Sequence, residues 1–138
     1  MDDTPLGWAA GNGHGAVVEL LLGRADIDPD KPDNRGQTPL SRAAQNGRTE
    51  VVKMLLERDD VNPNDTDEDG QTPLFRAAYY GYEAVVKLLL GQDDIDPDKP
   101  DVDGQTPLLL AACQGHQGVV KMLLGRDDVN LDKSDDRD

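Results

Sequence analysis

Apolar residues recur along this chain in two kinds of short cluster, and the spacing within each cluster is helical. In the clearest copy, Leu74, Ala77 and Ala78 stand at i, i+3 and i+4, which makes a narrow apolar stripe on one face of a helix. A second cluster of valines and leucines follows over residues 85–90. Gly81 lies between the clusters, and a glycine just past a helix readily takes the left-handed conformation that closes the last turn. The pattern therefore predicts two short helices joined by a tight turn.

The first helix of this pair carries a start signal. A threonine precedes a proline immediately before the apolar stripe, as at Thr72 and Pro73. The threonine side chain can accept an amide hydrogen of the first turn, and proline suits the first helical position because its missing N–H would have had no partner. The tripeptide Thr-Pro-Leu occurs four times, beginning at Thr4, Thr38, Thr72 and Thr106.

The two-helix unit therefore recurs along the whole chain with a period of 34 residues. When residues 24–57, 58–91 and 92–125 are aligned, 16 of 34 columns are identical. Helices this short are marginal alone in water, and each unit of such an array buries its apolar face only against its neighbours. We expect an all-α helix-turn-helix solenoid forming a single domain over residues 1–138, with four stacked repeats at about 1–34, 35–68, 69–102 and 103–138.

An acidic connector separates each helix pair from the next Thr-Pro-Leu. Residues 59–71 are typical, and they end in Asp69-Gly70-Gln71. Asp-Gly pairs are turn formers that tolerate positive φ. We therefore expect hairpin-like loops that project from the helices.

Together these residues resemble the ankyrin repeat. The chain carries Thr-Pro-Leu-x-x-Ala-Ala, then x-x-Gly, then Val-Val-Lys-x-Leu-Leu, then Asp-Gly-Gln before the next copy. The tetratricopeptide repeat shares the 34-residue period, but its Trp, Gly, Tyr and Pro pattern is absent. The resemblance implies a protein-protein interaction scaffold that binds a protein or peptide through its concave surface and hairpin tips.

The chain departs from the ankyrin pattern in three respects. Its period exceeds the family's ~33 residues, and its connectors are rich in aspartate and proline, which makes it similar to arrays in large multidomain fungal proteins. The glycine that usually ends the second helix is replaced by Arg-Asp-Asp, as at residues 58–60, and the following loop is longer and contains a proline. The usual histidine after Thr-Pro-Leu is also missing, so a histidine bridge between repeats is not expected, and the residues in its place are Gly7, Ser41, Phe75 and Leu109.

The net charge of the chain limits the classes of partner that it can bind. The formal net charge is −14, mostly from aspartates in the connectors. Nucleic acid and anionic membrane are excluded as partners, since both need clustered basic residues. No apolar run approaches the ~20 residues of a membrane span. The lone Cys113 permits no internal disulfide, which fits a reducing compartment, so we expect an intracellular protein, cytoplasmic or nuclear.

The 34-residue phase runs to both ends of the chain, which suggests a segment of a longer array. The last helical cluster keeps the internal apolar pattern, so we expect Val119 and Leu123 to be partly exposed there. We expect a monomer, with end-to-end stacking as the alternative.

Catalysis finds little support, and no enzyme activity or cofactor is expected. His14 and His116 follow the helix-ending glycine, where the other copies carry Arg48 and Tyr82, so a structural role is the better interpretation. Cys113 has no repeated acid or base beside it in the sequence.

One acidic motif suggests a metal. Asp65, Asp67, Asp69 and Gly70 match the start of a calcium-binding EF-hand loop. Position 12, where that loop needs a bidentate glutamate, is Arg76, and a helix start falls inside the loop. A solvated acidic hairpin is favoured, with an acidic calcium-responsive segment kept as an alternative function.

The chain's only phenylalanine and all its tyrosines gather in one place, at Phe75, Tyr79, Tyr80 and Tyr82. With Leu74 at the centre of the packed stripe, helical spacing puts these side chains outside it. The resemblance implies that the two residues after Ala-Ala touch ligands on the concave face. We expect the partner to be a protein or peptide that is basic at its rim, so that the acidic hairpins attract it. The predicted partner-binding residues are Arg42, Gln45, Asn46, Phe75, Arg76, Tyr79, Tyr80 and Gln114.

Two alternatives to this surface remain. The rings could fill gaps against neighbouring helices, and the segment could be a spacer within a larger protein that binds nothing itself. Trp8, alone in its column, is predicted to pack rather than to contact a ligand.

Overall fold

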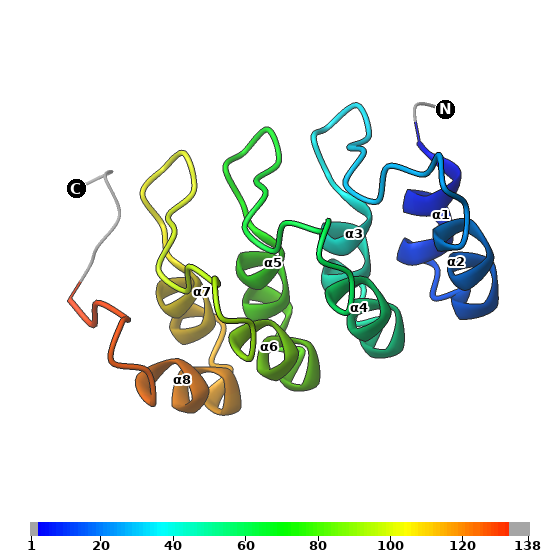
Figure 1. Cartoon of the computed structure of the whole chain (residues 1–138). Coiled ribbons are helices and arrows are strands. Elements are labelled where there is room, and N and C mark those ends of the chain that lie inside the picture. Colours follow the sequence, from blue (N-terminus) through cyan, green and yellow to red (C-terminus); the bar gives the residue numbers. More distant parts are fainter. Residues whose placement is uncertain (1–2, 133–138) are drawn as a thin grey trace.

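The computed structural model describes residues 3–132, which form four pairs of short helices (Figure 1). No strand occurs in this part of the chain, and none of its helices is both long and apolar enough to cross a membrane. The predicted all-α solenoid is therefore confirmed. The helices are α1 (Pro5–Gly11), α2 (Gly15–Leu22), α3 (Pro39–Gln45), α4 (Thr49–Leu56), α5 (Pro73–Tyr80), α6 (Glu83–Leu90), α7 (Pro107–Cys113) and α8 (Gln117–Leu124).

Each odd-numbered helix begins as its threonine and proline predict. The threonine Oγ1 accepts the N–H of the residue three positions on, as in α5, where Phe75 N donates to Thr72 Oγ1 at 3.1 Å. The other three odd-numbered helices repeat this bond at 2.9 to 3.2 Å. No side chain caps the even-numbered helices. Because they are only eight residues long, packing against neighbours must hold them.

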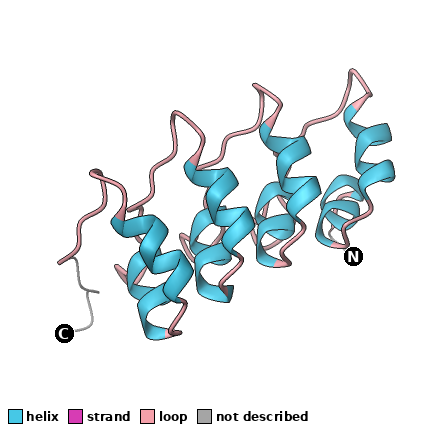
Figure 2. Ribbon diagram, turned by 90° about the horizontal axis from the view of Figure 1, so that it is seen from below, coloured by secondary structure: helices cyan, strands magenta, loops and turns pink. Residues whose placement is uncertain are grey.

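The helices are arranged in two layers. α3 lies between α1 and α5, and α5 lies between α3 and α7, while α4 and α6 make the corresponding contacts in the second layer. Figures 1 and 2 show the pairs side by side in chain order, with the first and last pairs at opposite ends. Each pair therefore rests on its immediate neighbours, as expected for a solenoid.

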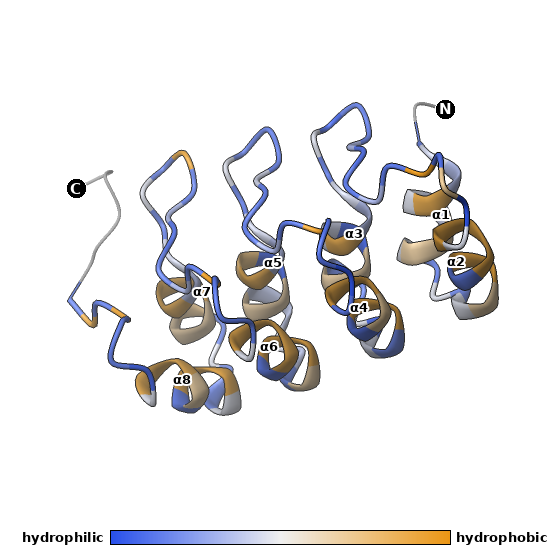
Figure 3. Cartoon of the chain, in the orientation of Figure 1, coloured by the Kyte–Doolittle hydropathy of each residue, from blue (hydrophilic) through white to orange (hydrophobic). Residues whose placement is uncertain are grey.

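The core fills the space between and within the layers. Leu74, Ala77 and Ala78 of α5 are fully buried, and α6 contributes Val86 and Leu89 to the same cluster. Figure 3 shows apolar residues concentrated on the helices and hydrophilic residues along the projecting loops. Complete burial of one leucine or valine side chain stabilises the fold by about 1.5–3 kcal/mol.

The last helix is buried more deeply than its sequence position predicts. Val119 and Leu123 are fully buried, so the expectation of partial exposure is wrong for both. They lie on the face of α8 that packs against α6 and α7. The exposure falls instead on Leu124, which is 51% exposed.

In the described part of the chain, three hairpin loops project, one beside each of α3, α5 and α7 (Figure 1). In the second, Asp67 N donates to Gln71 O at 3.1 Å, and Gly70 takes a φ of 75°, which a residue with a Cβ rarely adopts. The first and third hairpins carry the same bond, from Asp33 N to Gln37 O and from Asp101 N to Gln105 O.

A backbone hydrogen bond joins each hairpin to the next. Glu68 N donates to Arg35 O at 3.0 Å, and Val102 N donates to Asp69 O at 3.0 Å. The hairpins therefore form a second line of contact between repeats, separate from the helix core.

Candidate interaction surface

α5 presents two neighbouring tyrosines to solvent at its C-terminal end. Tyr79 is 37% exposed and Tyr80 is 45% exposed. Their ring centroids lie 4.9 Å apart with the planes at 81°, an edge-to-face arrangement that aromatic pairs favour. Tyr82 lies just beyond the helix, with its centroid 6.1 Å from that of Tyr80. The expectation that these tyrosines lie outside the packed stripe agrees with their exposure.

Phe75 differs from the tyrosines, because only 2% of it is exposed. The prediction that it lies outside the packed core is therefore wrong. α5 has a neighbour on each side, so its buried arc is wider than a stripe centred on Leu74. The equivalent residue of α3, Ser41, is also 2% exposed, whereas Leu109 of the last repeat is half-buried.

A cleft of about 280 Å³ opens where the hairpins meet α5 and α7. Tyr79 and Tyr80 line it together with the buried Phe75 ring and Leu110 of α7. The side chains on its polar side are Gln71, Arg76 and Gln105. Apolar surface flanked by a few polar groups is typical of a site that accepts another molecule.

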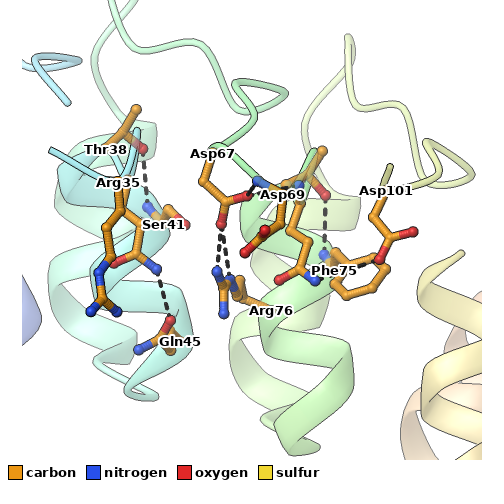
Figure 4. A network of polar contacts seen from close by, with 12 residues as sticks. Arg35, Thr38, Ser41, Gln45, Asp67, Asp69, Phe75, Arg76 and Asp101 are labelled. Carbon is orange, nitrogen blue, oxygen red and sulfur yellow. Dashed lines mark hydrogen bonds and ion pairs between the residues drawn. The ribbon is translucent and has the colours of Figure 1, made fainter. Parts of the chain in front are cut away.

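Arg76 is anchored to the hairpin above it. Its guanidinium donates from Nε to Asp67 Oδ2 at 3.2 Å and makes a second bond to the same oxygen (Figure 4). The Asp67 side chain is only 1% exposed, and its Oδ1 accepts the amides of Asp69 and Gln71 at 2.9 and 3.0 Å. Arg76 therefore compensates a buried carboxylate, a structural role that the sequence interpretation did not include.

The predicted contact residues of α3 are also engaged within the chain. Arg42 forms an ion pair with Asp3 at 2.9 Å and approaches Asp33 at 3.8 Å. Gln45 Oε1 accepts a hydrogen bond from Gln37 Nε2 at 3.0 Å. Asn46 Nδ2 donates to the carbonyl of Gly11 in the preceding repeat at 3.0 Å. These three side chains hold the first two repeats and their hairpin together.

Gln114 and Trp8 complete the comparison of predicted positions. Gln114, the counterpart of Tyr80 just after α7, is exposed. Trp8 is 48% exposed, so the prediction that it packs is wrong. It stands in the column of Arg42, Arg76 and Leu110, at the end of the stack where α1 has a neighbour on one side only.

A column that follows the helix-ending glycine links successive repeats. His116 Nε2 lies 2.9 Å from the carbonyl oxygen of Tyr79, and Arg48 Nε donates to the carbonyl of Gly11 at 3.1 Å. The Tyr82 ring covers Gly47 so closely that a Cβ there would lie 2.8 Å from Tyr82 Cε1. The structural interpretation of His116 agrees with this contact, and it extends to Tyr82. The sequence signal for this role was that these side chains occupy the same position in every repeat, directly after the helix-ending glycine.

The calcium motif is used differently from an EF-hand. Asp67, its second ligand position, has both oxygens engaged by backbone amides and Arg76. Asp65 Oδ1 accepts a bond from Asn62 Nδ2 at 2.9 Å. Within residues 3–132, no group of three or more His, Cys, Asp or Glu side chains is placed to hold a metal ion. The hairpin of residues 67–71 therefore uses its aspartates for its own turn.

Comparison with known proteins agrees with this architecture. The family described as ankyrin repeats in three copies matches residues 1–67 and 59–135, which together span nearly the whole chain. No curated protein matches the chain. This family match agrees with the capped first helices, the second helices paired with them and the projecting hairpins. The chain belongs to the ankyrin repeat family.

Proposed function

We propose that this chain binds a partner protein or peptide in the cleft between α5 and α7, with Tyr79 and Tyr80 as the principal contacts. The observation that carries the proposal is the exposed, edge-to-face tyrosine pair lining that cleft. Ankyrin repeats are generally protein-protein interaction modules. The choice of this site among the repeats rests on the tyrosines.

The residues of the cleft favour a partner segment that is apolar at its centre. Tyrosine is enriched at binding hot spots because it offers a large rigid contact area with a polar end. Phe75 and Leu110 supply apolar surface behind the tyrosines. A side chain that displaced water from this surface would gain binding energy by burial.

Arg76 supports the proposal even though it is bonded to Asp67. A guanidinium carries five N–H donors, and the two bonds to Asp67 use only part of that capacity. Arg76 also lines the cleft. It can therefore bond an acceptor on the partner while it stays in place.

Charge favours basic residues at the rim of the partner. The net charge is −14, and the exposed loops around the cleft include Glu68, Asp69 and Asp103. Opposite charge speeds association more than it tightens the final complex, and salt screens it. The rate of binding should therefore fall as salt is raised.

The test is affinity capture from a lysate, comparing the native chain with a Y79A/Y80A double variant and quantifying the captured proteins. We expect the double variant to lose selected partners, because truncation of a hot-spot residue costs about 1–4 kcal/mol of binding. Trp8→Ala is the matched control, since it removes an equally exposed aromatic from the far end of the stack.

Melting temperatures decide how the capture result is interpreted. Each variant must melt close to the native chain for a loss of capture to be attributed to the surface. If Y79A/Y80A and W8A capture the same proteins as the native chain, the proposal is wrong and a spacer role is favoured.

A further inference from the structure

The connectors of successive repeats are joined through one column of the sequence. A side-chain oxygen in each connector accepts a backbone N–H from the connector that follows it. We call these contacts the first, second and third joints. Their donor-acceptor pairs are Asn62 N to Asp30 at 2.8 Å, Asp96 N to Asn64 at 2.8 Å, and Asn130 N to Asp98 at 3.3 Å.

The second joint has one more hydrogen bond than the others. Asn64 Nδ2 donates to the carbonyl oxygen of Asp94 at 2.7 Å. In the first joint the corresponding atom is Asp30 Oδ1, which is buried and has no hydrogen-bond partner. Asp98 Oδ1 is in the same condition in the third.

The repeat indicates which group is expected opposite Asp30 Oδ1. The residue 34 positions before Asp94 is Asp60, so its carbonyl is the counterpart of the acceptor that Asn64 bonds. An ionised carboxylate accepts hydrogen bonds only, and so does a carbonyl. A direct hydrogen bond between two acceptors forms only if one of them carries a proton.

We propose that the first joint is closed by a proton: Asp30 is held protonated in mildly acidic solution, and its Oδ1–H donates to the carbonyl oxygen of Asp60. The protonated aspartic acid then reproduces both bonds of the second joint, accepting from Asn62 N as Asn64 accepts from Asp96 N. In neutral solution Asp30 ionises and the second bond is lost.

The surroundings of Asp30 favour the neutral form. The pKa of Asp30 is raised from 3.8 to about 6, chiefly by burial; the hydrogen bond from Asn62 N–H opposes this rise, and the nearby carboxylates of Asp65, Asp28 and Asp60 add to it. Asp28 lies on the same connector, while Asp60 and Asp65 come from the next one.

Two nearby cations, Arg58 and Lys99, interact with other carboxylates of the joint. Arg58 is held by Asp60 through two bonds of 2.9 Å. The pKa of Asp65 is raised, chiefly by burial, although the positive charge of Lys99 lowers it.

The sign of the effect follows from linkage. A carboxyl whose pKa is higher in the folded chain binds its proton more tightly there than in the unfolded chain. Its contribution to stability is fully present below the unfolded value of 3.8 and is lost as the pH rises through about 6. Acidification from neutral pH should therefore tighten the first joint.

Two measurements on the whole chain test the proposal. The first is a carboxyl-carbon NMR titration, in which the Asp30 resonance should move with a midpoint near 6. The second is the melting temperature as a function of pH for D30N, for D59N as a control, and for N64D. D59N removes the same charge from an exposed position beside the joint, which allows for the general relief of repulsion in a chain this acidic.

D30N carries the second bond at every pH. It should melt about 2–4 °C above D59N at pH 7.5 and show a flatter profile between pH 4 and 7. N64D should melt below the native chain at pH 7.5 and recover part of the loss at pH 5. An Asp30 midpoint near 4, or indistinguishable profiles for D30N and D59N, would overturn the proposal.

Discussion

The helices α3 and α5 occupy the same place in successive repeats, yet their variable side chains are used in opposite ways. At the end of α3, Gln45 bonds to Gln37, and the next residue, Asn46, bonds to the preceding repeat. On α5, the residues in the same two columns are Tyr79 and Tyr80, and both are exposed. A variable column therefore has two uses in this stack, to attach one repeat to another or to present a side chain to a partner.

The largest expected effect tests whether the two repeats share one scaffold. Leu55 of α4 and Leu89 of α6 occupy the same column, and both are fully buried. Truncating either to alanine should cost about 2–5 kcal/mol of unfolding free energy, because a cavity remains where the side chain packed. Urea unfolding measures both. Costs that differ by more than about 1.5 kcal/mol would show that the repeats are not equivalent frameworks.

A smaller effect separates the two arginines of the first layer. Arg76→Ala should destabilise the chain by about 1–3 kcal/mol, because it leaves the buried Asp67 carboxylate without its cation. Arg42→Ala should cost less, since the Asp33 oxygen lies 3.8 Å away and Asp3 is more exposed. Lys87→Ala, on the exposed face of α6, controls for the loss of a charge. Equal costs for Arg42→Ala and Arg76→Ala would contradict this ranking.

The smallest effects test the comparison directly. Asn46→Ala should cost about 1 kcal/mol, since it breaks a bond to the preceding repeat. Tyr80→Ala should change stability by less than about 0.5 kcal/mol, as is usual for an exposed position. Thermal unfolding in one buffer gives both values. A larger loss for Tyr80→Ala than for Asn46→Ala would mean that the aromatic rings pack the structure and that partners bind elsewhere.

Local signals were sufficient to predict most of the fold. The helix start at Thr72 and Pro73 and the turn at Asp69-Gly70 each depend on residues next to one another in the sequence. Neither depends on distant parts of the chain. The 34-residue period then indicated that the helix pairs stack on one another.

The uses of individual side chains could not be predicted in the same way. Asn46 bonds a carbonyl 35 residues away, and His116 approaches one 37 residues away, so their roles depend on how repeats meet. Phe75 is buried because α5 has neighbours on two sides, which periodicity along one helix does not reveal. The exposed tyrosines followed from helical spacing, whereas the anchoring of Arg76 required the hairpin's position.

The hydrogen bonds between hairpins have a mechanical consequence. Along one edge of the solenoid, Glu68 N to Arg35 O and Val102 N to Asp69 O connect the hairpins through one backbone bond each, while the opposite edge is packed helix. We expect the stack of repeats to resist bending more along the edge where helices pack than along the edge where hairpins are hydrogen-bonded. Because small rotations between repeats set the curvature of a solenoid, we expect bending to change how far the face that carries Tyr79 and Tyr80 is open.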